Sequence, residues 1–100
     1  MIEKEKFNVL NYVKKEEYTG SMDGMRYMLK AISKEDMEVI IWPEPYAYAY
    51  TPEEMKIRKQ FELSKDGVSQ ACDYLNEQYL AQKQLWDLSK NTNILNLGEG

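Results

Sequence analysis

The side chains that most enzymes use for proton transfer and metal binding are scarce in this chain. Its 100 residues include no histidine and a single cysteine, Cys72. Without histidine, neither a Ser-His-Asp nor a Cys-His arrangement can be assembled, and a zinc site lacks its usual ligands. The cysteine lies in a helical pattern without a basic neighbour in the local sequence, which is typical of a small packing residue and not of a reactive thiol.

Carboxylates occur in adjacent pairs, at Glu16-Glu17, Glu35-Asp36 and Glu53-Glu54. Such pairs can hold magnesium or perform acid-base chemistry. Their expected positions favour a structural explanation, because they fall beside a loop, in a hairpin turn and in the first turn of a helix, where acidic residues suit the dipole. Gly20 and Gly24 lack the lysine that follows a phosphate-binding loop. The sequence therefore predicts a protein that is not an enzyme and holds no cofactor or metal.

An aromatic segment is the one feature whose composition suits a binding surface. Between residues 42 and 50, a tryptophan is followed by three tyrosines that alternate with alanines. Tyrosine and tryptophan offer a large contact area, a polar tip and little loss of side-chain entropy. Basic residues near this segment in the sequence can hold an acidic group. The predicted interaction surface consists of Trp42, Tyr46, Tyr48, Tyr50, Arg26 and Arg58. The alternative is that the aromatic residues pack beneath a helix and that the basic residues are solvated.

Hydrophobic periodicity predicts a helix and three strands in the first two thirds of the chain. The apolar residues from Ile2 to Lys15 fall on a helical stripe, with a short strand as the alternative. Residues 25–32, 37–42 and 57–63 alternate in polarity or are rich in β-branched and aromatic side chains, which is typical of strands. The first two strands are expected to form a hairpin. Residues 18–24 contain two glycines, and we expect them to form a loop.

The most regular pattern follows the last predicted strand. Thr51–Glu54 first predicts a short helical turn. Ser64 is then placed to cap a helix that begins near Lys65 and ends near Ser89. The apolar stripe of this helix recurs every three or four residues and is interrupted at Gln82. Its members are Val68, Ala71, Cys72, Leu75, Tyr79 and Trp86.

The composition describes one small domain. With 43% hydrophobic and 30% charged residues, the chain holds enough apolar material for one core. We expect an α+β domain over residues 1–100 in the order α-β-β-β-α, with an antiparallel sheet of about three strands packed against the C-terminal helix. Residues from about 90 to 100 are expected to form a tail. The net charge of −4 and the absence of a signal or membrane-spanning stretch favour a cytoplasmic protein that avoids membranes and nucleic acid.

Two resemblances bear on this fold. The order of elements is similar to that of double-stranded RNA-binding domains, which carry a lysine cluster at the start of their last helix. Here Ser64–Val68 offers one lysine beside an aspartate. Four short motifs also resemble a family of small proteins of Gram-positive anaerobes, and this resemblance implies a fold but no activity. The motifs lie at Tyr18–Gly20, Gly24–Tyr27, Trp42–Tyr46 and Thr51–Glu54.

These features favour a noncatalytic role, in which the aromatic segment between Trp42 and Tyr50 binds a protein partner or a second copy of the chain. Two alternatives stay open. An acidic inhibitor from a mobile element would mimic nucleic acid by presenting carboxylates where phosphates would lie. A small-ligand or RNA-binding module would stack its tyrosines on the ligand.

Overall fold

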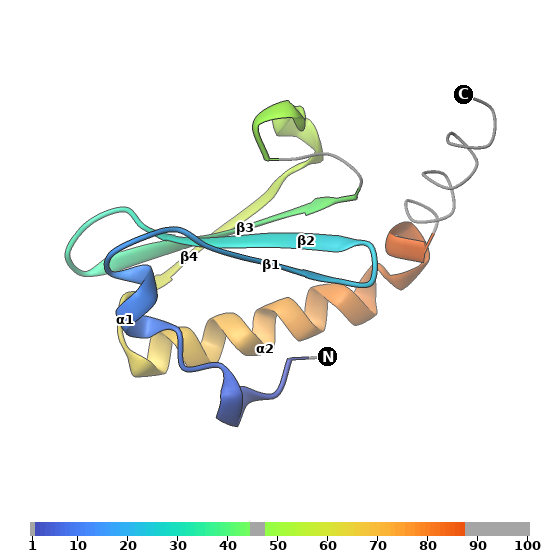
Figure 1. The fold of residues 1–100 in the computed structure, drawn as a ribbon. Helices are drawn as coiled ribbons and strands as arrows, with labels where there is room; N and C mark the ends of the chain where they lie inside the picture. Colours follow the sequence, from blue (N-terminus) through green and yellow to red (C-terminus); the bar gives the residue numbers. More distant parts are fainter. Residues whose placement is uncertain (1, 45–47, 88–100) are drawn as a thin grey trace.

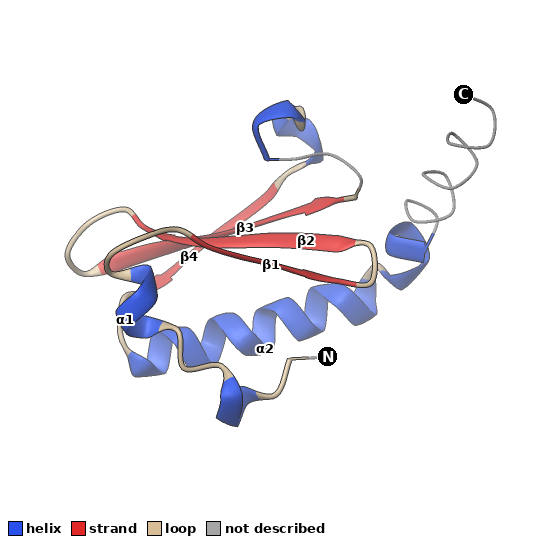
Figure 2. Cartoon of the chain, viewed as in Figure 1, coloured by secondary structure: helices blue, strands red, loops and turns tan. Residues whose placement is uncertain are grey.

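The protein forms an antiparallel sheet with one long helix along one of its faces (Figures 1 and 2). A computed structural model describes residues 2–44 and 48–87. The four strands lie side by side in chain order. The predicted α+β class is therefore confirmed, whereas the sheet has four strands instead of about three. The elements are η1 (Lys4–Lys6), α1 (Leu10–Val13), β1 (Tyr18–Met22), β2 (Met25–Ala31), β3 (Asp36–Pro43), η2 (Tyr48–Tyr50), η3 (Glu53–Met55), β4 (Ile57–Glu62) and α2 (Lys65–Ala81).

The additional strand is β1, and the prediction of a loop over residues 18–24 is wrong. β1 pairs antiparallel with β2. A turn of two residues joins them, with φ angles of 45° at Asp23 and 95° at Gly24, as in the type I′ turn that suits twisted hairpins. Gly20 is needed for a different reason, because a Cβ there would collide with the ring of Tyr27. The glycines that indicated a loop therefore serve a turn and a close approach within one hairpin.

The predicted helix from Ile2 to Lys15 is also wrong. Only η1 and a single α-helical turn, α1, form in this segment. Phe7, Val9 and Val13 are all buried against the sheet and α2. The first two of these are separated by one residue, a spacing that a continuous helix would place on different faces. Burial of both side chains therefore outweighs the weak helix preference of the segment.

Polar contacts attach the N-terminal segment to α2. The backbone N–H of Ile2 donates to Asn76 Oδ1 at 2.9 Å, and Asn76 Nδ2 donates to the carbonyl oxygen of Ile2 at 2.9 Å. Lys4 Nζ lies 2.8 Å from Asp73 Oδ2. These contacts hold the segment beside the helix, where it completes the core.

The cap and the apolar stripe predicted for α2 are confirmed. The Ser64 hydroxyl accepts a hydrogen bond from the N–H of Gly67 at 3.1 Å, which satisfies one of the free donors of the first turn. All six residues of the predicted stripe are buried. The sheet supplies the opposing layer of the core through Met25, Tyr27, Leu29, Met37, Val39 and Ile41.

The end of α2 differs from the prediction. The helix ends at Ala81 and not near Ser89, which lies outside the described residues. Gln82, where the stripe is interrupted, has φ −120° and ψ 28°, and residues 83–87 are helical again. This change of direction brings Trp86 against the backbone of Gly24 in the β1–β2 turn. The indole N–H of Trp86 donates to the carbonyl oxygen of Gln78 at 3.3 Å.

The remaining elements bear out most of the sequence expectations. β2 and β3 form the predicted hairpin, and β4 and η3 occupy the places expected for the third strand and the short turn. The tyrosine segment is not extended where it is described, because Tyr48–Tyr50 forms η2. Within the described ranges, we find no helix with both the length and the apolar character needed to cross a membrane.

Candidate functional site: the outer face of the sheet

The sheet face that α2 does not cover, called the outer face here, collects the predicted surface residues that can be placed. Side chains alternate between faces along each strand, and the register aligns them across the sheet. In Figure 1, the segment with η2 and η3 stands on this side, while α2 lies on the other. The strand residues of the outer face are Thr19, Ser21, Arg26, Met28, Lys30, Asp36, Glu38, Ile40, Trp42, Arg58, Gln60 and Glu62.

A small apolar cluster is buried on the outer face. It consists of Met28, Ile40 and Trp42, which are 4%, 0% and 4% exposed. Trp42 is therefore neither packed beneath α2 nor exposed to solvent. Arg26 lies opposite Trp42 across β2 and β3, and Arg58 lies opposite Ile40 across β3 and β4. Arginine stems can cover apolar surface while their charged ends stay hydrated, so both arginines are placed beside this cluster.

Arg58 is held by carboxylates of its own chain. Its Nε and Nη2 donate to the two carboxylate oxygens of Glu53, with the first at 3.1 Å and the second at 2.6 Å, and Nη1 donates to Glu38 Oε1 at 2.9 Å. The hydrogen bonds from Arg58, helped by Lys56, hold the pKa of Glu53 below its ordinary value. Arg58 thus connects η3 to β3 and β4, which is a structural task.

Arg26 is held less closely than Arg58 by the described residues. Its Nε is buried and has no hydrogen-bond acceptor there. The nearest carboxylate, Glu44 Oε1, is 3.9 Å away, at the outer limit of an ion pair. A buried donor without an acceptor costs about 1–3 kcal/mol. Binding of a hydrogen-bond acceptor from another molecule would therefore be favourable at this position.

A hollow of about 360 Å³ lies next to Arg26. It opens on the outer face beside β1, with the Trp42 cluster on one side and short hydroxyl side chains on the other. Its volume is at the lower end of the range for ligand pockets, about 300–1,000 Å³. The hollow is lined by Thr19, Gly20, Ser21, Arg26, Tyr27, Met28 and Trp42.

The structure thus brings together two residues of the predicted surface, Arg26 and Trp42, and gives Arg58 another task. Tyr50 is 82% exposed in η2. Tyr46 lies outside the described residues, and Tyr48 is placed by its backbone alone. The sequence does not reveal the hydroxyl side of the hollow, because the two glycines of residues 18–24 predict a loop there. The signal that identifies them as a strand is the Asp-Gly pair between two alternating stretches.

Among the residues that the structure describes, the other reactive groups do not assemble into a site. Cys72 is buried, and burial raises the pKa of its thiol. A second hollow, of about 320 Å³, lies between the N-terminal segment and α2 and includes Lys4, Phe7, Lys65 and Cys72 in its lining. Over residues 2–44 and 48–87, no three acidic, cysteine or histidine side chains gather as metal ligands would.

Comparisons with known proteins give no relative from which a role could be inferred. No protein family, no curated protein and no solved structure matches the chain. The resemblance to a family of Gram-positive anaerobes stays a prediction.

Proposed function

We propose that this domain is a noncatalytic interaction module whose outer face binds a protein partner or a second copy of the chain. The observation that carries the proposal is the hollow beside β1. There, the Nε of Arg26 lacks an acceptor within the described residues, and Met28 and Trp42 supply apolar area next to it. An arginine and an aromatic residue in one concave patch are typical of the residues that dominate binding energy at protein interfaces.

Filling the hollow tests this proposal. Ser21→Trp places a large side chain at its rim, while Gln70→Trp places the same side chain on the exposed surface of α2. Self-association is measured by sedimentation equilibrium. A partner is measured by affinity capture from cells, followed by titration of the captured protein in purified form. We expect Ser21→Trp to lose binding and Gln70→Trp to keep it, with both variants retaining a cooperative thermal transition. Equal binding by the two variants would contradict the proposal.

The tyrosine segment is tested separately by replacing Tyr46, Tyr48 and Tyr50 with serine. Loss of binding with an intact thermal transition would add these residues to the interface. Unfolding of the variant would instead assign a packing role to Tyr46 or Tyr48, because the loss of buried aromatic area destabilises the fold and Tyr50 is 82% exposed.

The acidic-mimic alternative receives no specific support from the described outer face. Its strands carry three cations, Arg26, Lys30 and Arg58, alongside three carboxylates, Asp36, Glu38 and Glu62. A protein that imitates a phosphate backbone needs a surface dominated by carboxylates. Mixed charge around an apolar cluster better fits a protein interface.

A further inference from the structure

The two edges of the sheet differ in a way that bears on partner choice. β1 and β4 are the edge strands. β4 carries Arg58, Lys59 and Glu62, and charges on an edge strand hinder the addition of another strand. β1 reads Tyr-Thr-Gly-Ser-Met and contains neither a charge nor a proline. β1 is therefore the edge that can accept a further strand.

The turn geometry determines which backbone groups of β1 face outward. In a hairpin with a turn of two residues, the residues that flank the turn, here Met22 and Met25, form a mutually hydrogen-bonded pair, and every second pair repeats it. The N–H and C=O groups of Thr19 and Ser21 consequently point away from β2. Neither residue makes a backbone hydrogen bond to another part of the described chain outside the sheet. They present free donors and acceptors along the edge.

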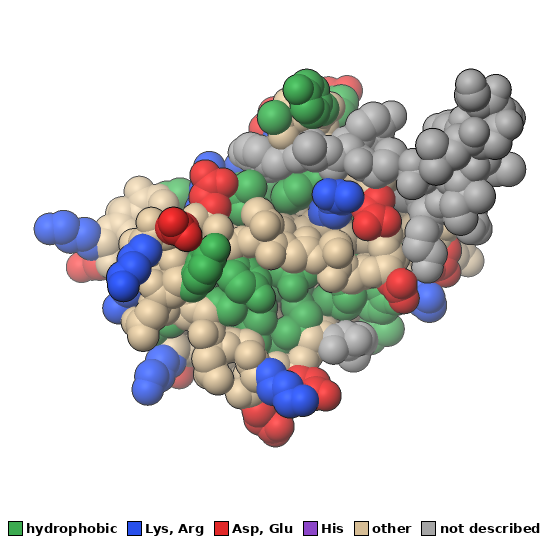
Figure 3. Space-filling view, viewed as in Figure 1, with side chains coloured by type: hydrophobic (Ala, Val, Ile, Leu, Met, Phe, Trp, Pro, Cys, Tyr) green, Lys and Arg blue, Asp and Glu red, His purple; other side chains and the backbone are tan. Residues whose placement is uncertain are grey.

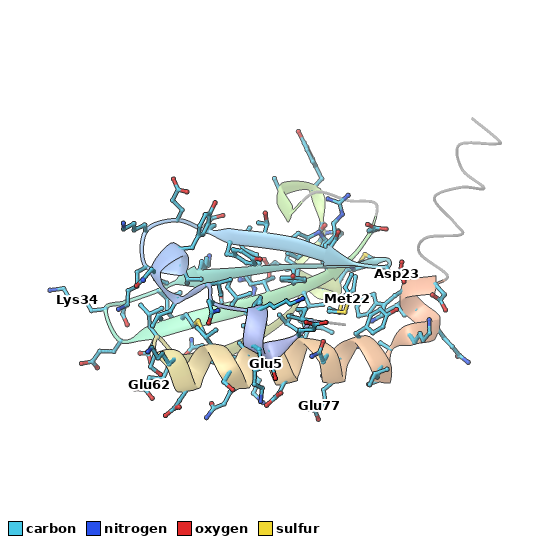
Figure 4. All side chains as sticks on the ribbon, turned by 60° about the horizontal axis from the view of Figure 1, so that its bottom comes forward. Glu5, Met22, Asp23, Lys34, Glu62 and Glu77 are labelled. Carbon is cyan, nitrogen blue, oxygen red and sulfur yellow. The ribbon has the colours of Figure 1, made fainter. Side chains whose placement is uncertain are left out.

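Apolar surface borders the same edge on the α2 side. Tyr18 packs edge-to-face against Phe7 and Tyr12, with ring centroids 5.8 and 5.5 Å apart. Tyr12 remains 50% exposed. Figure 3 shows hydrophobic side chains gathered between this edge and the N-terminal segment, and Figure 4 shows Met22 and Asp23 at the turn end of the hairpin, away from Lys34. A strand added to β1 would cover part of this apolar surface.

Charge selects the register in which a second copy fits. In an added antiparallel pair, residues whose backbone N–H and C=O groups point away from β2 must lie opposite residues of the same kind. A β1–β1 pair can therefore be centred on Thr19, Gly20 or Ser21. Centring on Gly20 places Glu17 opposite Asp23 of the second copy, and like charges directly opposite are destabilising. Centring on Ser21 places Thr19 opposite Asp23, in the β1–β2 turn of the second copy, so fewer residue pairs can form hydrogen bonds between the two strands.

Centring on Thr19 avoids both problems and brings an acceptor to Arg26. In this register, Glu17 of the second copy lies opposite Ser21, on the outer face. Ser21 pairs with Arg26 in the adjacent strand, so the carboxylate of Glu17 reaches across a short side chain toward the buried Nε. Glu17 is exposed, and no ion pair of the described residues involves it. On the other face, Tyr18 lies opposite Gly20 of the second copy.

We propose that the chain forms a two-fold dimer in which β1 pairs antiparallel with β1 of a second copy, centred on Thr19, and Glu17 of each copy binds Arg26 of the other. This inference rests on the proposed function and identifies its partner as the chain itself. The two four-stranded sheets then join into one continuous sheet, with both α2 helices on the same side. Each hollow beside β1 is completed by the other copy.

Sedimentation equilibrium of the full chain and its variants tests the dimer. Glu17→Gln and Arg26→Gln should each weaken dimerisation by about tenfold or more, because each removes a hydrogen bond between charged groups. The double variant should lose little beyond either single variant. Glu16→Gln is the matched control. Glu16 is also exposed, but it is the neighbour of Glu17, and successive side chains along a strand point to opposite faces, so this variant should dimerise as the parent does. Combining Glu17→Arg with Arg26→Glu should restore dimerisation.

The strand pairing has its own test. Ser21→Pro removes an outward donor without removing a hydrogen bond to β2, so a cooperative thermal transition with a monomeric protein is expected, and Ser21→Ala should remain dimeric. Thr19→Cys should form a disulfide across the two-fold axis under mild oxidation. A parent chain that stays monomeric at every concentration tested would overturn the inference. So would a dimer that is indifferent to the substitutions at Glu17 and Arg26. If a different protein binds the hollow of a monomeric chain, the dimer fails while the proposed function stands.

Discussion

Replacing Gly67 with alanine separates helix propensity from tertiary packing. Gly67 lies in the first turn of α2 and is buried. Propensity alone predicts that Gly67→Ala stabilises the helix by about 1 kcal/mol. The structure predicts the opposite sign, because a Cβ on Gly67 would collide with the carbonyl oxygen of Glu62 at the end of β4. The carbonyl oxygen belongs to the backbone, and the position of the Cβ is fixed by the backbone of residue 67, so neither atom can rotate away and the start of α2 must move off the sheet.

The size of the effect follows from these two opposing contributions. Overpacking of this kind costs about 1–3 kcal/mol, and a backbone obstacle places the cost near the upper end. Subtracting the gain of about 1 kcal/mol in propensity leaves a net loss of about 1–2 kcal/mol. At about 4–8 °C per kcal/mol for a domain of this size, the melting temperature should fall by about 4–16 °C.

Thermal unfolding followed by far-UV circular dichroism measures this shift. Gln70→Ala is the matched control, because Gln70 is exposed in the same helix, and it should change stability by no more than about 0.5 kcal/mol. A Gly67→Ala variant that melts at or above the parent temperature would refute the close contact between α2 and β4. It would also show that propensity governs this position.

Two further predictions concern titratable groups. Burial raises the pKa of the Cys72 thiol, so a thiol-specific reagent should label Cys72 slowly in the folded protein and rapidly in denaturant, and equal rates would contradict its burial. The hydrogen bonds from Arg58 lower the pKa of Glu53, so this ion pair contributes stability above the unfolded-state pKa of about 4.3 and loses it as pH falls through the lower folded value. Melting temperatures of the parent and of Glu53→Gln should therefore differ at neutral pH and converge in acid, and a gap that does not change with pH would refute this assignment.

Local patterns determined much of the fold. The cap at Ser64 and the stripe of α2 depend on residues within a few positions of one another, and the alternation in β2, β3 and β4 is equally local. The turn of the β1–β2 hairpin is also determined by two neighbouring residues, Asp23 and Gly24. The prediction of a loop there is wrong because two glycines in a short stretch indicate a loop as readily as a strand with a tight turn.

Only the tertiary structure decided which side chains meet. Arg26 and Trp42 are distant in sequence and become neighbours through the register of β2 and β3, and that register also places Trp42 on the face opposite α2. The obstacle to a side chain at Gly67 is likewise set by the docking of α2 on β4. Periodicity reports that one side of an element is apolar, because burial needs a continuous stripe. It does not report which partner covers that side, because that depends on how distant segments pack.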